Sequence, residues 1–302
     1  MPLHRSVRCF IIETYFFWEE REMFFQVEPL MPGLTRIWDV AHTAMYLVEG
    51  EEKAVLIDTG VGVGDLKSVV AGLTDKPLTV LLTHGHVDHA MGAASFERVH
   101  ISPLDEGVYM EHSHPMARRG YVSGAAMQGA DPALVAGVTD ADYLEAQAFS
   151  KFLPLVPGDR FELGSVSVEV LEGAGHTPGS VTVLIPEWRV LLLGDACNQF
   201  TFLFDSFASP LESYRQMLLR LKEKTEGRYD RVLVSHGMGE GGTGMIDSVL
   251  AVCDEIMAGK ADNLPFCNPM GSGLIAKAMD FSRFCRADGG EGNIIYNPLR
   301  LR

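Results

Sequence analysis

Short apolar segments separated by polar or glycine-rich turns dominate residues 35–102. The segments 35–40 and 44–48 have the side chains of strands and are close enough in sequence to pair. The same pattern predicts further strands at residues 54–57, 78–82 and 99–102. Residues 65–73 have the pattern of a short helix, and the small side chains of residues 90–95 predict the start of another.

The second half of the chain returns to regular patterning after a long irregular stretch. Strands are expected at residues 166–171, 181–185, 190–193 and 231–235, the middle two forming a hairpin. A helix is expected from Ser209, acting as its cap, to about Lys224, because apolar residues recur at helical spacing and Pro210 suits a first turn. A second helix is expected at 246–257. Glycine, proline and scattered aromatic residues predict an irregular tail over 261–302.

The irregular stretch at residues 104–155 mixes methionine, tyrosine, histidine, arginine and glycine without strand alternation. We expect a mostly helical insertion there, with one helix at 143–152. Long insertions of this kind are often functional, so a lid over a site is the expected role. An apolar face on this insertion would favour a homodimer.

The composition of the chain indicates which kinds of partner and compartment to expect. The chain has 302 residues, 47% of them hydrophobic, which is enough to bury a sizeable core. The formal net charge is −15 and no basic face is visible, so a nucleic-acid partner is not expected. No apolar run is long enough to span a membrane. Five widely spaced cysteines without a CxxC pair are typical of reduced thiols in a cytoplasmic protein.

The N-terminus imitates a signal peptide, since Arg5 and Arg8 precede an apolar stretch. Glu13 interrupts that stretch, and no small-residue cleavage site follows it, which argues against secretion. Strand-like patterning begins only after Met23. We therefore interpret residues 1–22 as an appendage, namely an extension upstream of a start at Met23.

Four metal-capable side chains fall within six residues just after the expected strand 78–82. They are His84, His86, Asp88 and His89. Imidazole and carboxylate are common ligands of zinc, iron and manganese. A polar loop with surface histidines is the alternative, but chance rarely places four such side chains at one strand end.

Further candidate ligands follow three other expected strands in the same way: His176, Asp195 and His236. Asp58 also stands at the end of an expected strand. Four separate strand ends that carry metal-capable side chains indicate one convergent site at one edge of a sheet system. Each of these residues could instead have an ordinary structural role. A histidine can lie in a turn or loop, and an aspartate can cap a helix or stabilise a turn.

Together these motifs resemble the metallo-β-lactamase-fold superfamily over about residues 23–257. The matching motifs, in family order, are Asp58-Thr59-Gly60, His84-x-His86-x-Asp88-His89, Gly175-His176-Thr177-Pro178-Gly179, Gly194-Asp195 and Ser235-His236-Gly237. The resemblance implies an α/β fold, namely an αβ/βα four-layer sandwich of two packed sheets with helices outside. Residues 258–302 would form a C-terminal extension to it.

The resemblance also implies two metal ions, zinc in the first instance and iron or manganese as alternatives. The first ion would be held by His84, His86 and His176. The second would be held by Asp88, His89 and His236. Asp195 would bridge the two ions, and Asp58 would orient ligands without binding metal. Asp88, Asp195 and Asp58 are thus the expected catalytic residues.

The implied reaction is hydrolysis of a small-molecule ester, thioester or lactone by a hydroxide held between the metals. The motifs look most like the branch that contains hydroxyacylglutathione hydrolases and lactonases. True β-lactamases typically lack the bridging aspartate that Asp195 would supply. The alternatives are an oxidoreductase similar to the single-iron persulfide dioxygenases, and a phosphodiesterase.

Candidate contacts to the substrate are carried by two segments. The insertion offers five polar side chains, which a solvated lid would also explain: His112, His114, Arg118, Arg119 and Tyr121. The apolar loop 200–207 offers Phe200 and Phe202 as a pocket wall, for which core packing is the alternative. Cys197 is interpreted as a small buried side chain.

Overall fold

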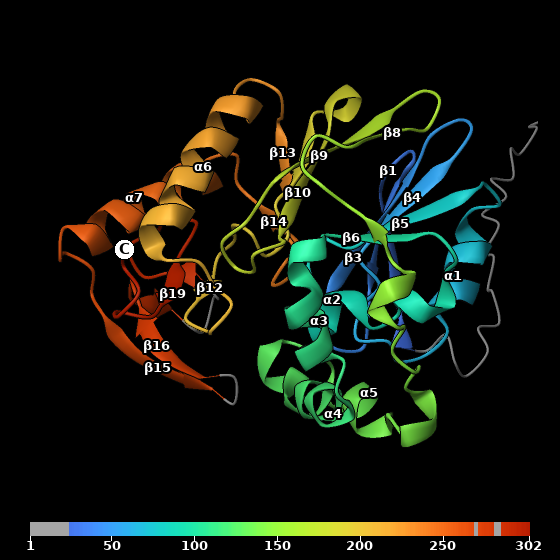
Figure 1. Ribbon diagram of the computed structural model, residues 1–302, viewed down its shortest axis with the longest axis horizontal. Coiled ribbons are helices and arrows are strands. Elements are labelled where there is room, and N and C mark those ends of the chain that lie inside the picture. The colour runs from blue at the N-terminus through green and yellow to red at the C-terminus, as the bar shows by residue number, and fades with distance from the viewer. Residues whose placement is uncertain (1–23, 269–270, 281–284) are drawn as a thin grey trace, which may run out of the picture.

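In a computed structural model of the chain, the structure describes residues 24–268, 271–280 and 285–302 (Figure 1). The appendage expected at residues 1–22 lies outside these residues. Across the described part of the chain, every helix is too short or too polar to cross a lipid bilayer.

The first sheet has seven strands within the described residues, and they lie in chain order. They are β1 (Gln26–Met31), β2 (Leu34–Trp38), β3 (Ala44–Glu49), β4 (Ala54–Ile57), β5 (Leu78–Leu81), β6 (Val99–Ile101) and β7 (Leu153–Pro154). Neighbours from β1 to β4 are antiparallel, whereas β4 to β7 are parallel. The expected helix after β4 is α1 (Leu66–Leu73), and its cap Asp65 accepts a hydrogen bond from the Ser68 amide at 3.1 Å.

The second sheet has the strand order β14-β13-β11-β10-β9-β8. The strands are β8 (Arg160–Glu162), β9 (Ser167–Glu172), β10 (Val181–Ile185), β11 (Val190–Leu192), β13 (Arg231–Leu233) and β14 (Glu240–Gly241). The expected hairpin is confirmed, because β10 pairs antiparallel with β11. Since β10 is antiparallel to β9 as well and β13 is parallel to β11, the strands β9, β11 and β13 all run in one direction.

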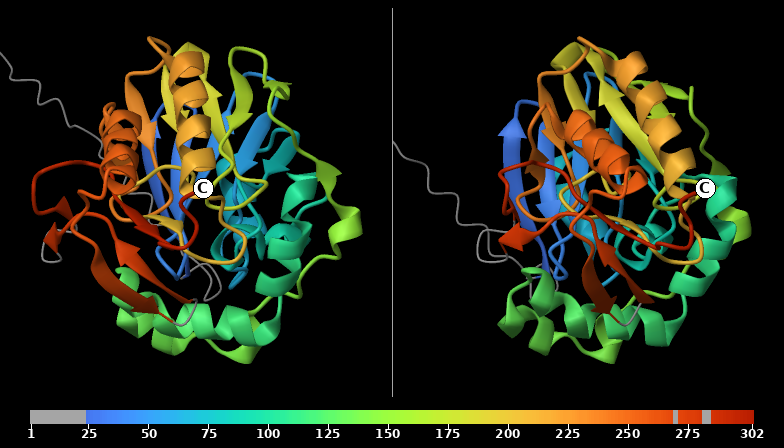
Figure 2. Two further views of the ribbon diagram at one scale, coloured as in Figure 1. Left: turned by 60° about the vertical axis from the view of Figure 1, so that its left-hand side comes forward. Right: turned by 90° about the vertical axis from the view of Figure 1, so that its left-hand side faces the viewer.

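The two sheets pack face to face, and helices cover both outer faces (Figures 1 and 2). Apolar side chains from both sheets share the central core, among them Tyr46, Val55, Leu81, Val168, Val183 and Leu192. Helix α1 packs on the outside of the first sheet. Helices α6 (Leu211–Thr225) and α7 (Met245–Met257) pack on the outside of the second. The expected αβ/βα four-layer sandwich is therefore confirmed.

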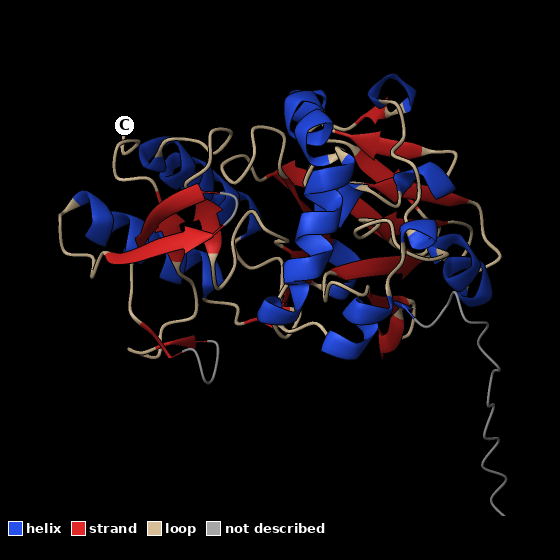
Figure 3. Cartoon of the chain, turned by 90° about the horizontal axis from the view of Figure 1, so that it is seen from below, coloured by secondary structure: helices blue, strands red, loops and turns tan. Residues whose placement is uncertain are grey.

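The insertion covers one end of the sandwich with short helices (Figure 3). They are α3 (Glu106–His112), α4 (Pro115–Gly124) and α5 (Pro132–Gly137). The prediction of a helix at 143–152 is wrong, because only a 3-10 turn at Phe149–Lys151 forms there. Tyr143 pairs with Val63 instead, so tertiary pairing overrides local propensity. The helix expected to start at 90–95 begins earlier, inside the ligand motif, as α2 (Val87–Ala90).

The C-terminal tail is not irregular, and that prediction is wrong. It forms strands that join a segment of the loop 200–207 in a third sheet, of order β12-β19-β16-β15. The strands are β12 (Thr201–Leu203), β15 (Leu264–Asn268), β16 (Gly271–Ile275) and β19 (Ile294–Tyr296), and a separate pair consists of β17 (Met279–Asp280) and β18 (Cys285–Arg286). The parallel pair of β12 with β19 joins residues about ninety positions apart, which local patterning does not reveal.

The start of α6 also differs from the prediction. Pro210, not Ser209, occupies the cap position, and no side chain caps the helix. The amides of Leu211 and Glu212 instead donate to the carbonyl oxygens of Arg300 and Leu301, each at 3.0 Å. The C-terminal backbone thus satisfies amides that a helix cannot satisfy within itself.

Tyr46 connects the two sheets at the edge where the candidate ligands lie. Its buried hydroxyl, on β3, is 2.6 Å from the carbonyl oxygen of Val234 and 2.8 Å from that of Gly239. We predict that Tyr46→Phe lowers the free energy of unfolding by roughly 1–3 kcal/mol, because it removes the donor that lies 2.6 Å from the buried Val234 carbonyl oxygen. Urea unfolding followed by circular dichroism measures this difference.

Tyr229→Phe is the matched control, because the Tyr229 hydroxyl donates to the Thr243 carbonyl at an exposed position. Its expected effect is within about 0.5 kcal/mol. Equal destabilisation by the two variants would contradict the role given to Tyr46.

Candidate metal centre

The candidate ligands lie at one edge of the sandwich because strands of both sheets end there. Asp58 follows β4 and the His84–His89 motif follows β5, and these two strands are parallel. His176, Asp195 and His236 follow β9, β11 and β13, which run in one direction. The amide of Val181 donates to the carbonyl oxygen of Thr83 at 2.9 Å and ties the two sets of loops together.

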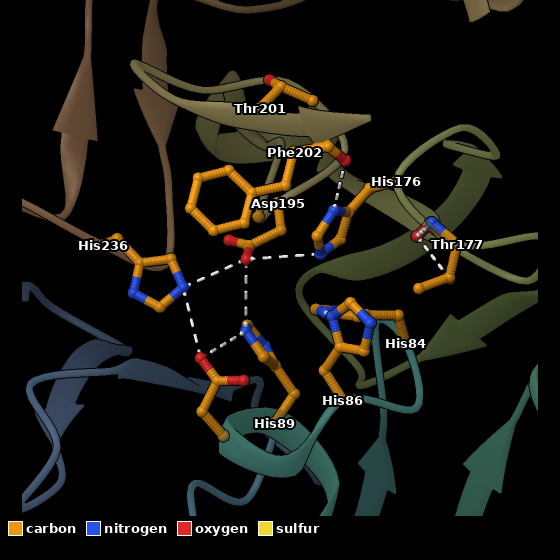
Figure 4. A network of polar contacts seen from close by, with 12 residues as sticks. His84, His86, His89, His176, Thr177, Asp195, Thr201, Phe202 and His236 are labelled. Atoms are coloured by element: carbon orange, nitrogen blue, oxygen red, sulfur yellow. Dashed lines mark hydrogen bonds and ion pairs between the residues drawn. The ribbon is translucent and has the colours of Figure 1, made fainter. Parts of the chain in front are cut away.

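Three imidazoles form the first group, His84, His86 and His176, with one possible ligand atom from each within 4.8 Å of the others. The Nδ1 atom of His176 lies 2.9 Å from the carbonyl oxygen of Phe202, which makes this nitrogen the donor (Figure 4). The Nε2 atom of His176 is therefore the free acceptor that faces the group. The Nε2 atoms of His86 and His176 are both buried without a hydrogen-bond partner in the described residues.

The second group consists of Asp88, His89 and His236, whose possible ligand atoms also lie within 4.8 Å of one another. The Oδ2 atom of Asp88 is 3.4 Å from His89 Nε2 and 3.3 Å from His236 Nε2. His89 and Asp88 are buried, whereas the His236 side chain is 30% exposed. This group therefore lies on the more open side of the centre.

Asp195 lies between the two groups (Figure 4). Its Oδ2 atom is 3.0 Å from His236 Nε2 and 3.6 Å from His89 Nε2, both of the second group. The same oxygen is 3.7 Å from His176 Nε2, of the first group. A single carboxylate oxygen can therefore face ions bound to either group.

Asp58 lies behind His89 and contacts its ring. Its Oδ2 atom is 2.8 Å from His89 Nδ1, which leaves His89 Nε2 to face the centre. Its Oδ1 atom accepts the Thr83 amide at 2.7 Å, and the Thr83 hydroxyl also donates to this carboxylate. The backbone of Asp58 has a φ of 65°, a left-handed conformation that non-glycine residues rarely adopt. The three hydrogen bonds hold it there.

Sequence reasoning missed Asp105, which joins the two ligand-bearing loops. The side chain is fully buried and accepts the Gly85 amide at 2.8 Å, the Thr177 hydroxyl at 2.8 Å and the Gly179 amide at 2.6 Å. It therefore bridges the loop of His84 to the loop of His176. Asp105 comes shortly after β6 in the sequence, as Asp58 comes directly after β4, and this position could have indicated it as a candidate.

The structure separates the substrate candidates of the insertion into two sets. His112 stacks on His86 with ring centroids 4.3 Å apart, and its Nδ1 accepts the Val87 amide at 3.3 Å. The Tyr121 hydroxyl donates to Asp88 Oδ2 at 2.7 Å. His114, by contrast, is exposed and caps α4. The two arginines point away from the ligands, since Arg118 is buried against backbone carbonyls and Arg119 pairs with Asp140 on the surface.

The aromatic candidates also differ from each other. The Phe202 ring is drawn on the side of the centre that carries Asp195 and His236 (Figure 4), and it packs against Phe266 of β15 with centroids 5.8 Å apart. Phe200 is partly buried against the small apolar cluster of the third sheet. Cys197 is fully buried in the core, as expected.

Burial lowers the pKa of His84 and of His86 well below the usual range, and neighbouring imidazoles lower both further. Both rings are therefore neutral, which is the form that binds metal. Burial acts to raise the pKa of Asp88 and of Asp195, but the imidazoles of His89 and His236 outweigh it, and both pKa values are lowered. The two carboxylates are therefore ionised.

The pKa of His89 and the pKa of His236 are raised above the usual value for histidine. Burial acts to lower each pKa, but nearby carboxylates outweigh it: those of Asp88, Asp58 and Asp195 for His89, and chiefly that of Asp195 for His236. The centre thus favours positive charge next to its carboxylates. Buried nitrogens without partners, neutral imidazoles and ionised carboxylates together fit a divalent metal with nitrogen and oxygen ligands.

Comparison with known proteins places these features in a family. The family model for the metallo-beta-lactamase superfamily matches residues 38–236. An uncharacterised protein of Mycobacterium leprae (strain TN) is 31% identical over 191 residues, which are 61% of this chain and 80% of that protein. The acyl-coenzyme A thioesterase MBLAC2 of Homo sapiens is 26% identical over 217 residues, which cover 64% of this chain and 72% of that protein.

Solved structures show a similar arrangement. A metallo-beta-lactamase from Pontibacter korlensis has a TM-score of 0.54 at 20% identity, over 76% of this chain and 99% of its own. The sec-alkylsulfatase Pisa1 from Pseudomonas sp. has a TM-score of 0.55 at 17% identity, over 78% of this chain and 42% of its own. At such identities the likeness shows the fold and leaves the reaction open.

We predict that Asp105→Asn destabilises the protein and weakens metal binding together. The amide keeps the shape of the side chain but replaces an acceptor with a donor, so a buried amide or hydroxyl loses its partner. The expected loss is roughly 1–3 kcal/mol in the free energy of unfolding. Because two ligand loops are released, zinc affinity should also fall, which titration calorimetry measures.

Asp140→Asn is the control, because it makes the same change of charge at an exposed residue paired only with Arg119 on the surface. Its effect on stability should stay within about 0.5 kcal/mol. If Asp105→Asn left zinc affinity at the wild-type value, Asp105 would not organise the centre.

Proposed function

The chain belongs to the metallo-beta-lactamase superfamily, and on that premise we propose that it is a binuclear metal-dependent hydrolase of a small-molecule ester, thioester or lactone. The position of Asp195 supports this most directly, because one of its oxygens faces imidazoles of both ligand groups. The alternative is a single ion held by His84, His89 and Asp195, whose possible ligand atoms also lie within 4.8 Å of one another.

We assign two zinc ions to the centre, with iron or manganese as alternatives. His84, His86 and His176 would hold one ion, and Asp88, His89 and His236 would hold the other. When bound, such ions supply Lewis acidity and lower the pKa of a water molecule from about 15.7 to about 7. Asp195 would bridge the ions, so its charge would hold them close together.

The chain's own side chains act by orientation and charge. Asp58 holds the His89 ring with Nε2 toward the centre, and the Phe202 carbonyl does the same for His176. Asp88 and Asp195 stay ionised, so both can balance the charge of bound cations. His112, with Nδ1 accepting a backbone amide, carries its proton on Nε2 when neutral and can donate it to a substrate.

Among the substrate classes, we favour an acyl thioester. The Phe202 ring beside Asp195 and the Phe266 ring next to it offer an apolar wall for an acyl group. The similarity to MBLAC2, which is described as an acyl-coenzyme A thioesterase, points to the same class. His112 and the helices of the insertion would cover the other side of the substrate.

A screen of the zinc-loaded protein over thioesters, lactones, phosphodiesters and sulfate esters tests this proposal. Thioester hydrolysis with two zinc ions per chain is the expected result. One iron per chain with oxygen consumption would indicate a persulfide-dioxygenase-like reaction instead. Cleavage restricted to phosphodiesters would likewise overturn the assignment.

We predict that Asp195→Ala abolishes hydrolysis and lowers metal content. Loss of the shared carboxylate removes a ligand from both ions, so activity should fall by at least about 100-fold. Kinetics and elemental analysis of the same preparation give both readouts. Asp230→Ala is the control, because Asp230 pairs with Arg189 on the surface, and it should change neither readout. Retention of both ions by Asp195→Ala would refute the bridging role.

A further inference from the structure

Helix α4 of the insertion presents two side chains, Arg118 and Tyr121, one turn apart on the face that meets the sandwich. The helix packs against α2, which carries Asp88 and His89. Its Val122 joins an apolar cluster with Val61 of the loop after β4. The insertion is thus docked directly behind the second ligand group.

Arg118 anchors this helix in an unusual way. Its side chain is buried, at 4% exposure, and its guanidinium donates to backbone carbonyl oxygens of Val61 at 3.3 Å, Gly62 at 3.1 Å and Leu144. In the described residues, no carboxylate forms an ion pair with it; the ring of Tyr143 lies 5.5 Å from the guanidinium carbon. Burying this charge is unfavourable unless the carbonyl contacts form. Arg118 therefore favours the one docked position of α4 in which these carbonyl contacts form.

Tyr121 extends this docking to a ligand. Its hydroxyl donates to Asp88 Oδ2 at 2.7 Å, which is the oxygen that faces His89 and His236. The Thr43 hydroxyl donates to the same oxygen at 3.3 Å. In the shorter of these two bonds, the Tyr121 phenol is the donor and the Asp88 carboxylate is the acceptor. The bond therefore restricts the rotation of the Asp88 carboxylate.

We propose that Tyr121 is a positioning residue for the second metal, so that helix α4 belongs to the metal site as well as covering it. The inference rests on the metal-dependent function proposed above. Because linkage is reciprocal, a bond that strengthens metal binding must also be strengthened by the metal. Zinc should therefore stabilise the docked form of α4, and the docked form should favour zinc.

Zinc titration of the full chain against a chelating dye tests the first half of this proposal. Tyr121→Phe should weaken the second binding step by about 10- to 100-fold and leave the first step within about threefold of wild type. Tyr109→Phe is the matched control. It removes a hydroxyl from the same insertion, but that hydroxyl donates to the Gln147 carbonyl at 2.8 Å and not to a ligand. It should leave both binding steps unchanged.

Hydrogen exchange of the α4 amides tests the second half. Zinc should slow exchange in α4 of the wild-type protein, and the slowing should be smaller by the same factor in Tyr121→Phe. Thermal unfolding of both variants without metal verifies that they fold.

An unchanged second binding step in Tyr121→Phe, or an equal loss in Tyr109→Phe, would overturn the proposal. If wild type binds two zinc ions and hydrolyses nothing, the proposed reaction fails while the Tyr121 result still decides the positioning role.

Discussion

The structure depends on the carboxylate of Asp195, one oxygen of which lies within 3.7 Å of three imidazole nitrogens. Each of these imidazoles follows a different strand, so the arrangement requires correct register in both sheets at once. Two side chains support that register. The Tyr46 hydroxyl joins β3 of the first sheet to the segment after β13, and the Asp105 carboxylate joins the loop of His84 to the loop of His176. Charge imposes a second requirement, since two ionised carboxylates are buried here and need cations or donors around them.

Local patterning identified the elements that carry the ligands but not the contacts between distant elements. The strands before Asp58, His84 and Asp195 were predictable because each is a short apolar run that ends in a turn. The pairing of β12 with β19 was not, because it joins residues about ninety positions apart. Among the polar residues of the insertion, sequence could not separate Tyr121 from His114. Which side chain faces Asp88 depends on how α4 docks, and a buried arginine that donates to backbone carbonyls has no sequence signature.

Strand β12 contributes to the centre in two ways. Its Phe202 carbonyl orients the His176 ring, and its Phe202 side chain lies beside Asp195. Because β19 pairs with β12, the C-terminal sheet supports both contributions. A change in that sheet would therefore affect both the orientation of His176 and the position of Phe202. The first sheet has a comparable arrangement, in which Asp58 holds His89 from one side while α4 holds Asp88 from the other.

The capping of α6 by the carbonyl oxygens of Arg300 and Leu301 has a consequence for synthesis on the ribosome. The first sheet and every candidate ligand have been translated by the time residue 236 is added. β12 has no β19 to pair with, and α6 has no cap, until residues 294–301 leave the exit tunnel. At translation rates of about 5–20 residues per second, that interval lasts several seconds. During that interval, the His176 side of the candidate ligand set lacks the support of β19.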